Sequence, residues 1–393
     1  MPMLRGLRSV LPVYVAIFLL TGGTLAQTPP PEGVKVRELG PIQPHWVFLI
    51  SPAGLDSEEA TKVEVIDGDS FQLLGMLTGG LLATSTLSPD HKFIYLADTF
   101  YSRGSRGDRT DVVTAYDARR LAPAHETVIP PKRQQHIPPD SSALAVTPDG
   151  RFLLVANLTP ATSMTVVDVA NHKALGEIET SGCTGALISG PRRFESLCGD
   201  GAMLTVDFDD SGKATASKRM AAPFFDPEKD PVFSIPAVLG KSAFFISYHG
   251  AVHPVDWSVE PAKGGEPWSL VTDAERKAGW RPGGYQPLAG YAPGNLFYVL
   301  MHRGGEWTHK QSGIEVWVFN AEQKRRVDKI VLPRPGSGVY VTRDRDPRMF
   351  VVSLPELGGM PSAPMLQSFS TASGRYLGAL DQLPGFPMWI FGP

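Results

Sequence analysis

A repeat of about 50 residues constrains this chain more than any other feature of its sequence. Each copy is an apolar strand ending in a small polar residue, then a short turn and another strand. The seven ending residues, here called markers, are Asp67, Asp117, Asp168, Asp207, Asp256, Asn320 and Ser370, separated by 50, 51, 39, 49, 64 and 50 residues. In three copies a glycine follows the marker by eight positions (Gly75, Gly176 and Gly378), which indicates a shared hairpin geometry.

A second pattern precedes several markers, as in "LSPDHKFIYLAD" and "VTPDGRFLLVAN". Each is a turn rich in Pro, Asp or Gly followed by an apolar strand. One unit therefore holds four strands, and seven such units predict an all-β chain, a seven-bladed β-propeller with four-stranded blades spanning residues 45–393. An array of two-sheet sandwiches is the alternative. The longest step contains "DAERKAGW", which predicts a short helical insertion.

The N-terminus has the pattern of an export signal. Arg5 and Arg8 precede an apolar run over residues 11–20, and small residues follow at 24–26. About ten apolar residues are too few to span a ~30 Å hydrocarbon core, so residues 1–26 are predicted to be a cleaved signal peptide. An uncleaved N-terminal anchor is the alternative. The proline-rich residues 27–44 are expected to form an extended arm, and no later stretch is apolar enough to span a membrane.

Two cysteines, Cys183 and Cys198, flank a predicted hairpin whose midpoint falls at Gly190-Pro191. Folding at that turn places the thiols opposite each other, so an exported chain is predicted to form a disulfide. Two buried free thiols are the alternative. The net charge of −3 offers no basic surface for nucleic acid.

Polar loops supply the remaining candidates. His302 and His309 lie seven residues apart with no third ligand nearby, so no metal site is predicted. No nucleophile elbow, Walker loop or HExxH motif occurs. The loop "SRGSRGDRTD" and the stretch containing "GEWTHKQ" are interpreted as contact surfaces for a partner, with internal ion pairing as the alternative for the first. The predicted docking residues are Arg103, Arg106, Arg109, Trp307 and His309.

The longest of these stretches carry a resemblance. "DTFYSRGSRGDRTDVVTAYD", "DAERKAGWRPGGYQP", "GGEWTHKQSGIEVWVFNAEQKRRV" and the two-cysteine hairpin resemble the large (heavy) subunit of the quinoprotein amine dehydrogenases of bacterial periplasms, the methylamine and aromatic amine enzymes. The resemblance implies a periplasmic heterotetramer of two large and two small subunits. It also implies that tryptophan tryptophylquinone is built in the small subunit, so this chain holds no cofactor and no catalytic residue. The enzyme would convert primary amines to aldehyde and ammonia and pass electrons to a cupredoxin, amicyanin or azurin.

The same resemblance implies a wall for the substrate channel. The family carries a Phe shortly after the first strand, where this sequence reads "SPAGL" and has Leu55. That departure leaves the substrate preference open. Phe100 and Tyr101 are further candidates for the wall, with blade packing as their alternative role. Two other functions remain possible from sequence: an exported stand-alone propeller that binds a ligand or partner, and a self-sufficient propeller enzyme such as a lactonase.

Overall fold

The computed structural model describes residues 38–53, 60–355 and 363–393, and residues from Glu38 onward form one compact unit. The predicted signal peptide, the arm up to residue 37 and Leu55 lie outside the described residues. Within the described part, no helix is long and apolar enough to cross a bilayer.

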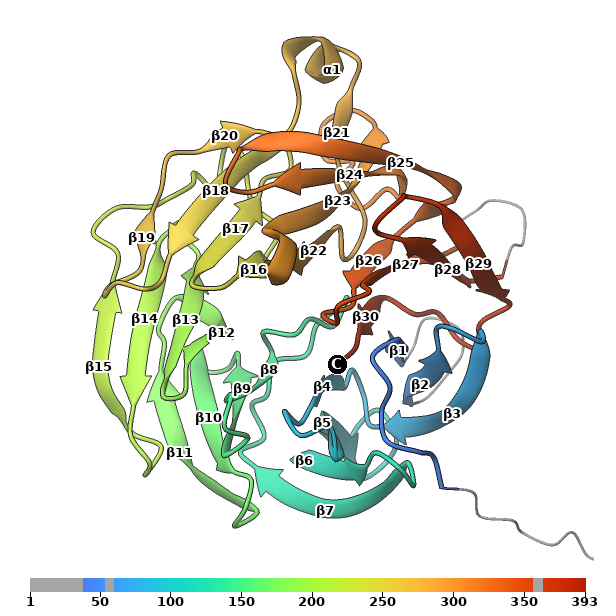
Figure 1. Ribbon diagram of the computed structural model, residues 1–393. Helices are drawn as coiled ribbons and strands as arrows, with labels where there is room; N and C mark the ends of the chain where they lie inside the picture. Colours follow the sequence, from blue (N-terminus) through green and yellow to red (C-terminus); the bar gives the residue numbers. More distant parts are fainter. Residues whose placement is uncertain (1–37, 54–59, 356–362) are drawn as a thin grey trace, which may run out of the picture. The chain divides into compact units, whose positions relative to one another are not determined.

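Seven antiparallel sheets follow one another around a ring, which confirms the predicted seven-bladed propeller (Figure 1). From the innermost strand outward, blade 1 is β30 (Trp389–Phe391), β1 (Trp46–Ser51), β2 (Thr61–Asp67) and β3 (Gln72–Gly79); blade 2 is β4 (Thr84–Leu87), β5 (Phe93–Tyr101), β6 (Arg109–Asp117) and β7 (Ala122–Ile129); blade 3 is β8 (Leu144–Val146), β9 (Phe152–Asn157), β10 (Ser163–Asp168) and β11 (Lys173–Glu179); blade 4 is β12 (Cys183–Gly190), β13 (Arg193–Cys198), β14 (Met203–Phe208) and β15 (Ala214–Arg219).

The three remaining blades include the two irregular ones. Blade 5 is β16 (Ala237–Leu239), β17 (Ser242–Ile246), β18 (Ala251–Asp256) and an outer position split into β19 (Lys263–Gly264) and β20 (Trp268–Ser269); blade 6 has β21 (Trp280–Pro282) and β22 (Leu288–Tyr291) both beside β23 (Leu296–Arg303), then β24 (Gly313–Asn320) and β25 (Arg325–Gly336); blade 7 is β26 (Gly338–Val341), β27 (Arg348–Ser353), β28 (Met365–Ser370) and β29 (Tyr376–Asp381). Helix α1 (Asp273–Lys277) is the predicted insertion, and a 3₁₀ turn covers Ala292–Gly294.

The ring closes through a strand that the repeat pattern did not reveal. β30 pairs with β1, with Ile390 opposite Leu49, so blade 1 combines both ends of the propeller sequence. The side chain of Gln286 fastens this strand: its Oε1 accepts from the Ile390 N–H at 2.8 Å, and its Nε2 donates to the Ile390 carbonyl at 2.9 Å. Closure leaves no unpaired inner edge on blade 1.

The marker residues stand at the end of the third strand in each blade because their side chains cap the turn that follows. Asp67 Oδ1 accepts the Asp69 N–H at 2.9 Å, and Asn320 Oδ1 accepts the Gln323 N–H at 2.8 Å. Such Asx turns satisfy backbone donors that no strand can pair. Four positions after the marker the backbone turns left-handed in five blades, at Phe71, Leu121, His172, Lys324 and Gly374.

The glycines eight positions after the marker lie at β-bulges. Gly75, Gly176 and Gly378 pair with Val65, Val166 and Ser368, and the register shifts immediately afterwards in all three hairpins. A Cβ on Gly75 would stand 2.5 Å from Leu121 Cδ1 of the next blade, and one on Gly378 would stand 2.7 Å from Phe71 Cε2. At these two positions the glycine makes room for the left-handed turn residue of the neighbouring blade.

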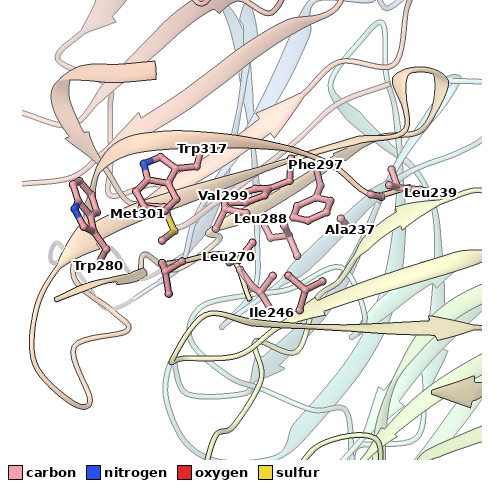
Figure 2. Packing of buried hydrophobic residues seen from close by; sticks show 14 residues of the cluster. Ala237, Leu239, Ile246, Leu270, Trp280, Leu288, Phe297, Val299, Met301 and Trp317 are labelled. Carbon is pink, nitrogen blue, oxygen red and sulfur yellow. The ribbon is translucent and has the colours of Figure 1, made fainter. Parts of the chain in front are cut away.

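Apolar side chains fill the spaces between adjacent blades. Figure 2 shows the cluster between blades 5 and 6, where Ile246 of β17 faces Val299 and Met301 of β23. Trp280 and Trp317 complete the outer end of this cluster, with ring centroids 5.1 Å apart. Because each blade packs on two neighbours in this way, the loops at the ends of the strands are carried on a rigid ring.

The predicted disulfide is confirmed. Cys183 and Cys198 are bonded and stand directly opposite each other on β12 and β13 of blade 4. In the chain-entropy model, closing a loop of this size stabilises the fold by about 3 kcal/mol.

Candidate functional site

The loops that join the second and third strands all emerge on the same side of the ring, because strand directions alternate in the same order in every blade. This side is called the loop face. It carries the loop between β5 and β6, which holds the predicted arginines, and the loop between β23 and β24, which holds Trp307 and His309. The candidate docking residues therefore share one face although about 200 residues of sequence separate the two loops.

The loop between β5 and β6 is a tight hairpin that leaves two arginines free. The Asp108 N–H donates to Ser102 Oγ at 3.0 Å, and the Arg103 N–H donates to the Arg106 carbonyl at 3.0 Å. Arg103 and Arg106 are exposed, and neither makes an ion pair with a described residue. Two solvated guanidinium groups at a loop tip are suited to contact an anionic surface.

Arg109 has a different role from the other two arginines. Its guanidinium makes a bidentate pair with the buried Asp111 at 2.9 and 2.8 Å, and this hydrogen-bonded pair raises the pKa of Arg109. It also donates to the Arg133 carbonyl at 2.9 Å. Arg109 therefore anchors the loop, as the ion-pairing alternative expected, while Arg103 and Arg106 remain available on the surface.

Behind this loop lies a buried charge that the sequence did not reveal. Arg133 is 2% exposed and donates to the carbonyls of Leu81 and Leu82 at 2.9 and 3.0 Å, while its backbone N–H donates to Asp111 at 2.9 Å. Burial lowers the Arg133 pKa to about 10 and raises the pKa of nearby Asp98 to about 6. Arg133 thus ties the connections between blades 1 and 2 and between blades 2 and 3 to the base of the arginine loop.

Phe100 and Tyr101 end β5 where it enters the arginine loop. Phe100 is 44% exposed and Tyr101 is half-buried. An exposed aromatic ring beside two free arginines is compatible with a channel wall covered by a partner, and the assignment stays a prediction. Leu55, the third predicted wall residue, is not among the described residues.

Trp307 lies at the tip of the loop between β23 and β24 and is 66% exposed. Its backbone is left-handed, with φ of 61°, which is costly for a residue other than glycine. Hydrogen bonds on either side hold that conformation: Thr308 Oγ1 donates to the Gly305 carbonyl at 2.8 Å, and the Gln311 N–H donates to the Thr308 carbonyl at 2.8 Å. A large, rigidly presented aromatic side chain is typical of an interface anchor.

The two histidines of this stretch are packed. His302 is 3% exposed, its Nε2 lies 2.9 Å from Thr308 Oγ1, and burial lowers its pKa to about 4. The His309 ring stacks on Tyr248 with centroids 3.8 Å apart and meets Phe233 edge-on. His309 therefore joins this loop to blade 5, and Trp307 is the member of the predicted docking pair that faces solvent.

The segment "WRPGG" is the foundation of the Trp307 loop. Arg281 donates to the Gly305 carbonyl, the Gly284 N–H donates to the His309 carbonyl at 3.0 Å, and the Gly304 N–H donates to the Gly279 carbonyl at 3.0 Å. Two motifs that carried the family resemblance are thus one structural unit. Among the described residues, no group of three or more His, Cys, Asp or Glu side chains could hold a metal ion.

Comparison with known proteins matches the whole propeller. The family model described as methylamine dehydrogenase heavy chain (MADH) matches residues 44–391. The methylamine dehydrogenase heavy chain of Paracoccus versutus is 29% identical over 346 residues, covering 88% of this chain and 78% of that protein. That of Methylobacillus flagellatus is 28% identical over 367 residues, covering 93% and 89%.

Solved structures show the same fold at lower identity. Dihydro-heme d1 dehydrogenase NirN has a TM-score of 0.54 with 15% identity, covering 91% of this chain and 77% of that one. A functionally unknown protein from Desulfotomaculum acetoxidans has a TM-score of 0.57 with 14% identity, covering 89% and 99%. These two similarities show the propeller architecture alone.

Proposed function

This chain belongs to the methylamine dehydrogenase heavy-chain family, and from that membership we propose that it is the large subunit of an enzyme that oxidises primary amines with a quinone held in a separate small subunit. The observation that carries the proposal is the extent of the family match, residues 44–391. That range includes every blade and both loops that present free side chains on the loop face.

In the proposed complex, the small subunit's tryptophan tryptophylquinone takes two electrons from a primary amine and releases an aldehyde and ammonia. The tryptophans of this chain do not suit that role. Trp280 and Trp317 lie close together, yet they are 6% and 0% exposed, and Arg326 and Lys329 cover the Trp317 ring at 4.2 Å each. An amine could not reach them, which supports a quinone located in the partner.

This chain's own residues would shape access to the quinone and hold the partner. Phe100 and Tyr101, together with Leu55, would wall the substrate channel, and Arg103, Arg106 and Trp307 would contact the small subunit. The half-exposed ring of Phe100 and the absence of ion pairs at Arg103 and Arg106 within the described residues support these roles.

The wider setting is part of the same proposal. The N-terminal pattern of Arg5, Arg8 and an apolar run supports export, and the disulfide between Cys183 and Cys198 supports an oxidising compartment, the periplasm. Family membership supports an assembly of two large and two small subunits that delivers electrons to a cupredoxin. An exported stand-alone binding propeller is the competing function.

Expressing the chain with and without its small subunit tests the proposal. A closed propeller folds without a partner, so the isolated chain is expected to be folded, colourless above about 300 nm and inactive. The purified complex is expected to show a quinone absorbance and amine-dependent reduction of a dye or copper protein. Amine oxidation by the isolated chain, or no complex with any small quinone-bearing subunit encoded beside it, would contradict the large-subunit assignment.

A further inference from the structure

The loop face carries a cleft between the Trp307 loop and blade 7. The cleft has a volume of about 520 Å³, and residues of β23, the loop that follows it, and the ends of β25 and β27 line it. Ile314, Leu354 and Phe386 make an apolar floor, and Ile314 is 41% exposed. Arg303 and Lys310 are exposed and belong to the same lining.

The charge of this cleft is entirely positive within the described lining. None of its eleven lining residues is acidic, and neither Arg303 nor Lys310 makes an ion pair with a described carboxylate. The Arg303 guanidinium stands 4.8 Å from the centre of the Trp280 ring, which positions it without neutralising it. The buried His302, whose pKa falls to about 4, adds no charge near neutral pH.

The cleft is also preformed. A Cβ on Gly283 would stand 2.3 Å from His302 Nδ1 and 2.5 Å from the Gln311 carbonyl, so only glycine allows the "WRPGG" segment to pack this closely beneath the loop. The hydrogen bonds that hold Trp307 in its left-handed conformation end beside Lys310. A site whose shape is fixed before binding loses little conformational entropy on binding.

Two positive charges also exclude one class of occupant. A primary amine is a cation near neutral pH and would be repelled, so this cleft is not where the substrate enters. An anionic occupant with an apolar portion matches both the charged rim and the apolar floor.

We propose that this cleft receives an acidic segment of the small subunit, with carboxylates pairing to Arg303 and Lys310 and an adjoining apolar side chain packing on Ile314 and Phe386. The identity of the partner rests on the proposed function; the charge and apolar character of the segment rest on the cleft itself. The cleft would then orient the small subunit over the loop face while Trp307 anchors its edge.

Association kinetics of separated, refolded subunits test the proposal. Lys310→Glu is expected to slow association about 10-fold or more at low ionic strength, and the difference is expected to shrink as salt screens the interaction. Arg303→Gln is expected to give a smaller loss in the same direction. Lys213→Glu is the matched control, because Lys213 is an exposed lysine that lies after the turn between β14 and β15, on the opposite face.

Each result has a separate meaning. Association of Lys310→Glu at the wild-type rate, with unchanged salt dependence, would overturn the inference. Normal assembly with slower cupredoxin reduction would also overturn it, because the cleft would then receive the electron acceptor. If the wild-type chain binds no small subunit, the proposed function itself fails, which the wild-type measurement alone reveals.

Discussion

Glu195 is a fully buried carboxyl beside the disulfide hairpin of blade 4. Ser189 Oγ and Thr205 Oγ1 lie 3.0 and 2.6 Å from its two oxygens, and burial raises its pKa to about 7 from an ordinary 4.5. The folded protein therefore holds this carboxyl protonated at mildly acidic pH, where an unfolded chain would ionise it. The stability that Glu195 contributes is complete below pH 4.5 and is lost as the pH rises through 7.

Glu195→Gln is expected to remove that pH dependence. A neutral amide keeps two polar atoms for the hydroxyl groups but cannot ionise, so between pH 4.5 and 8 the wild type should lose up to about 3 kcal/mol that the variant retains. Denaturant unfolding at both pH values measures the difference. Glu228→Gln, which removes an exposed carboxylate, is the control. Parallel pH curves for wild type and Glu195→Gln would refute the prediction.

At this scale, sequence predicts which residues lie on the surface better than which residues support them. Arg103, Arg106 and Trp307 fall in loops rich in glycine and charge, and such loops follow directly from the strand pattern. Arg133 has no local signal, because its burial depends on carbonyls more than 50 residues away in sequence. For the same reason the stacking of His309 on Tyr248 could not be read from either segment alone.

At the scale of single elements, helix α1 shows how one residue fixes an insertion. Glu275 accepts the Thr272 N–H at 3.0 Å in a capping box and pairs with Arg326 and Lys329 of β25 at 2.8 and 3.1 Å. These two cations hold the Glu275 pKa near 2 even though burial opposes ionisation, and both lie over the Trp317 ring. Glu275 therefore links the helix cap to the outer surface of blade 6.

Glu275→Ala is expected to lower the free energy of unfolding by about 1–3 kcal/mol, because it removes a cap and leaves two clustered cations without their shared carboxylate. Faster proteolytic cleavage around residues 265–280 should accompany the loss. Asp273→Ala, an exposed acid in the same first turn, is the control. Equal stability of the two variants would mean that the helix is held by its neighbours and not by Glu275.

The elements themselves were largely predictable because the markers reflect a physical device repeated in every blade. An Asp or Asn at the strand end caps the turn, and the glycine opposite the bulge clears space for the next blade, so both leave a periodic trace. β30 left no such trace, since it is only three residues long. The division of blade 5's outer position into β19 and β20 was equally invisible, because two-residue strands carry no alternation.

At the scale of the whole molecule, the pairing of β30 with β1 is expected to decide cooperativity. Ile390→Pro removes the N–H that donates to Gln286 and disturbs the pairing with Leu49, at a cost of about 3 kcal/mol or more. Calorimetry should show a lower midpoint and a broader transition. Ile390→Val keeps the N–H and costs about 0.5–1.5 kcal/mol. A narrow transition for Ile390→Pro, at the midpoint of Ile390→Val, would show that closure is not limiting.

This closure sets an order of events during biosynthesis. A nascent chain delivers β1 early, but its inner neighbour does not exist until the ribosome has passed residue 391. During the intervening synthesis of more than 300 residues, β1 carries an unpaired edge of the kind that recruits strands from other chains. Premature termination anywhere before β30 therefore yields an open arc with two unsatisfied ends, a product prone to aggregate and readily recognised by proteases as incomplete.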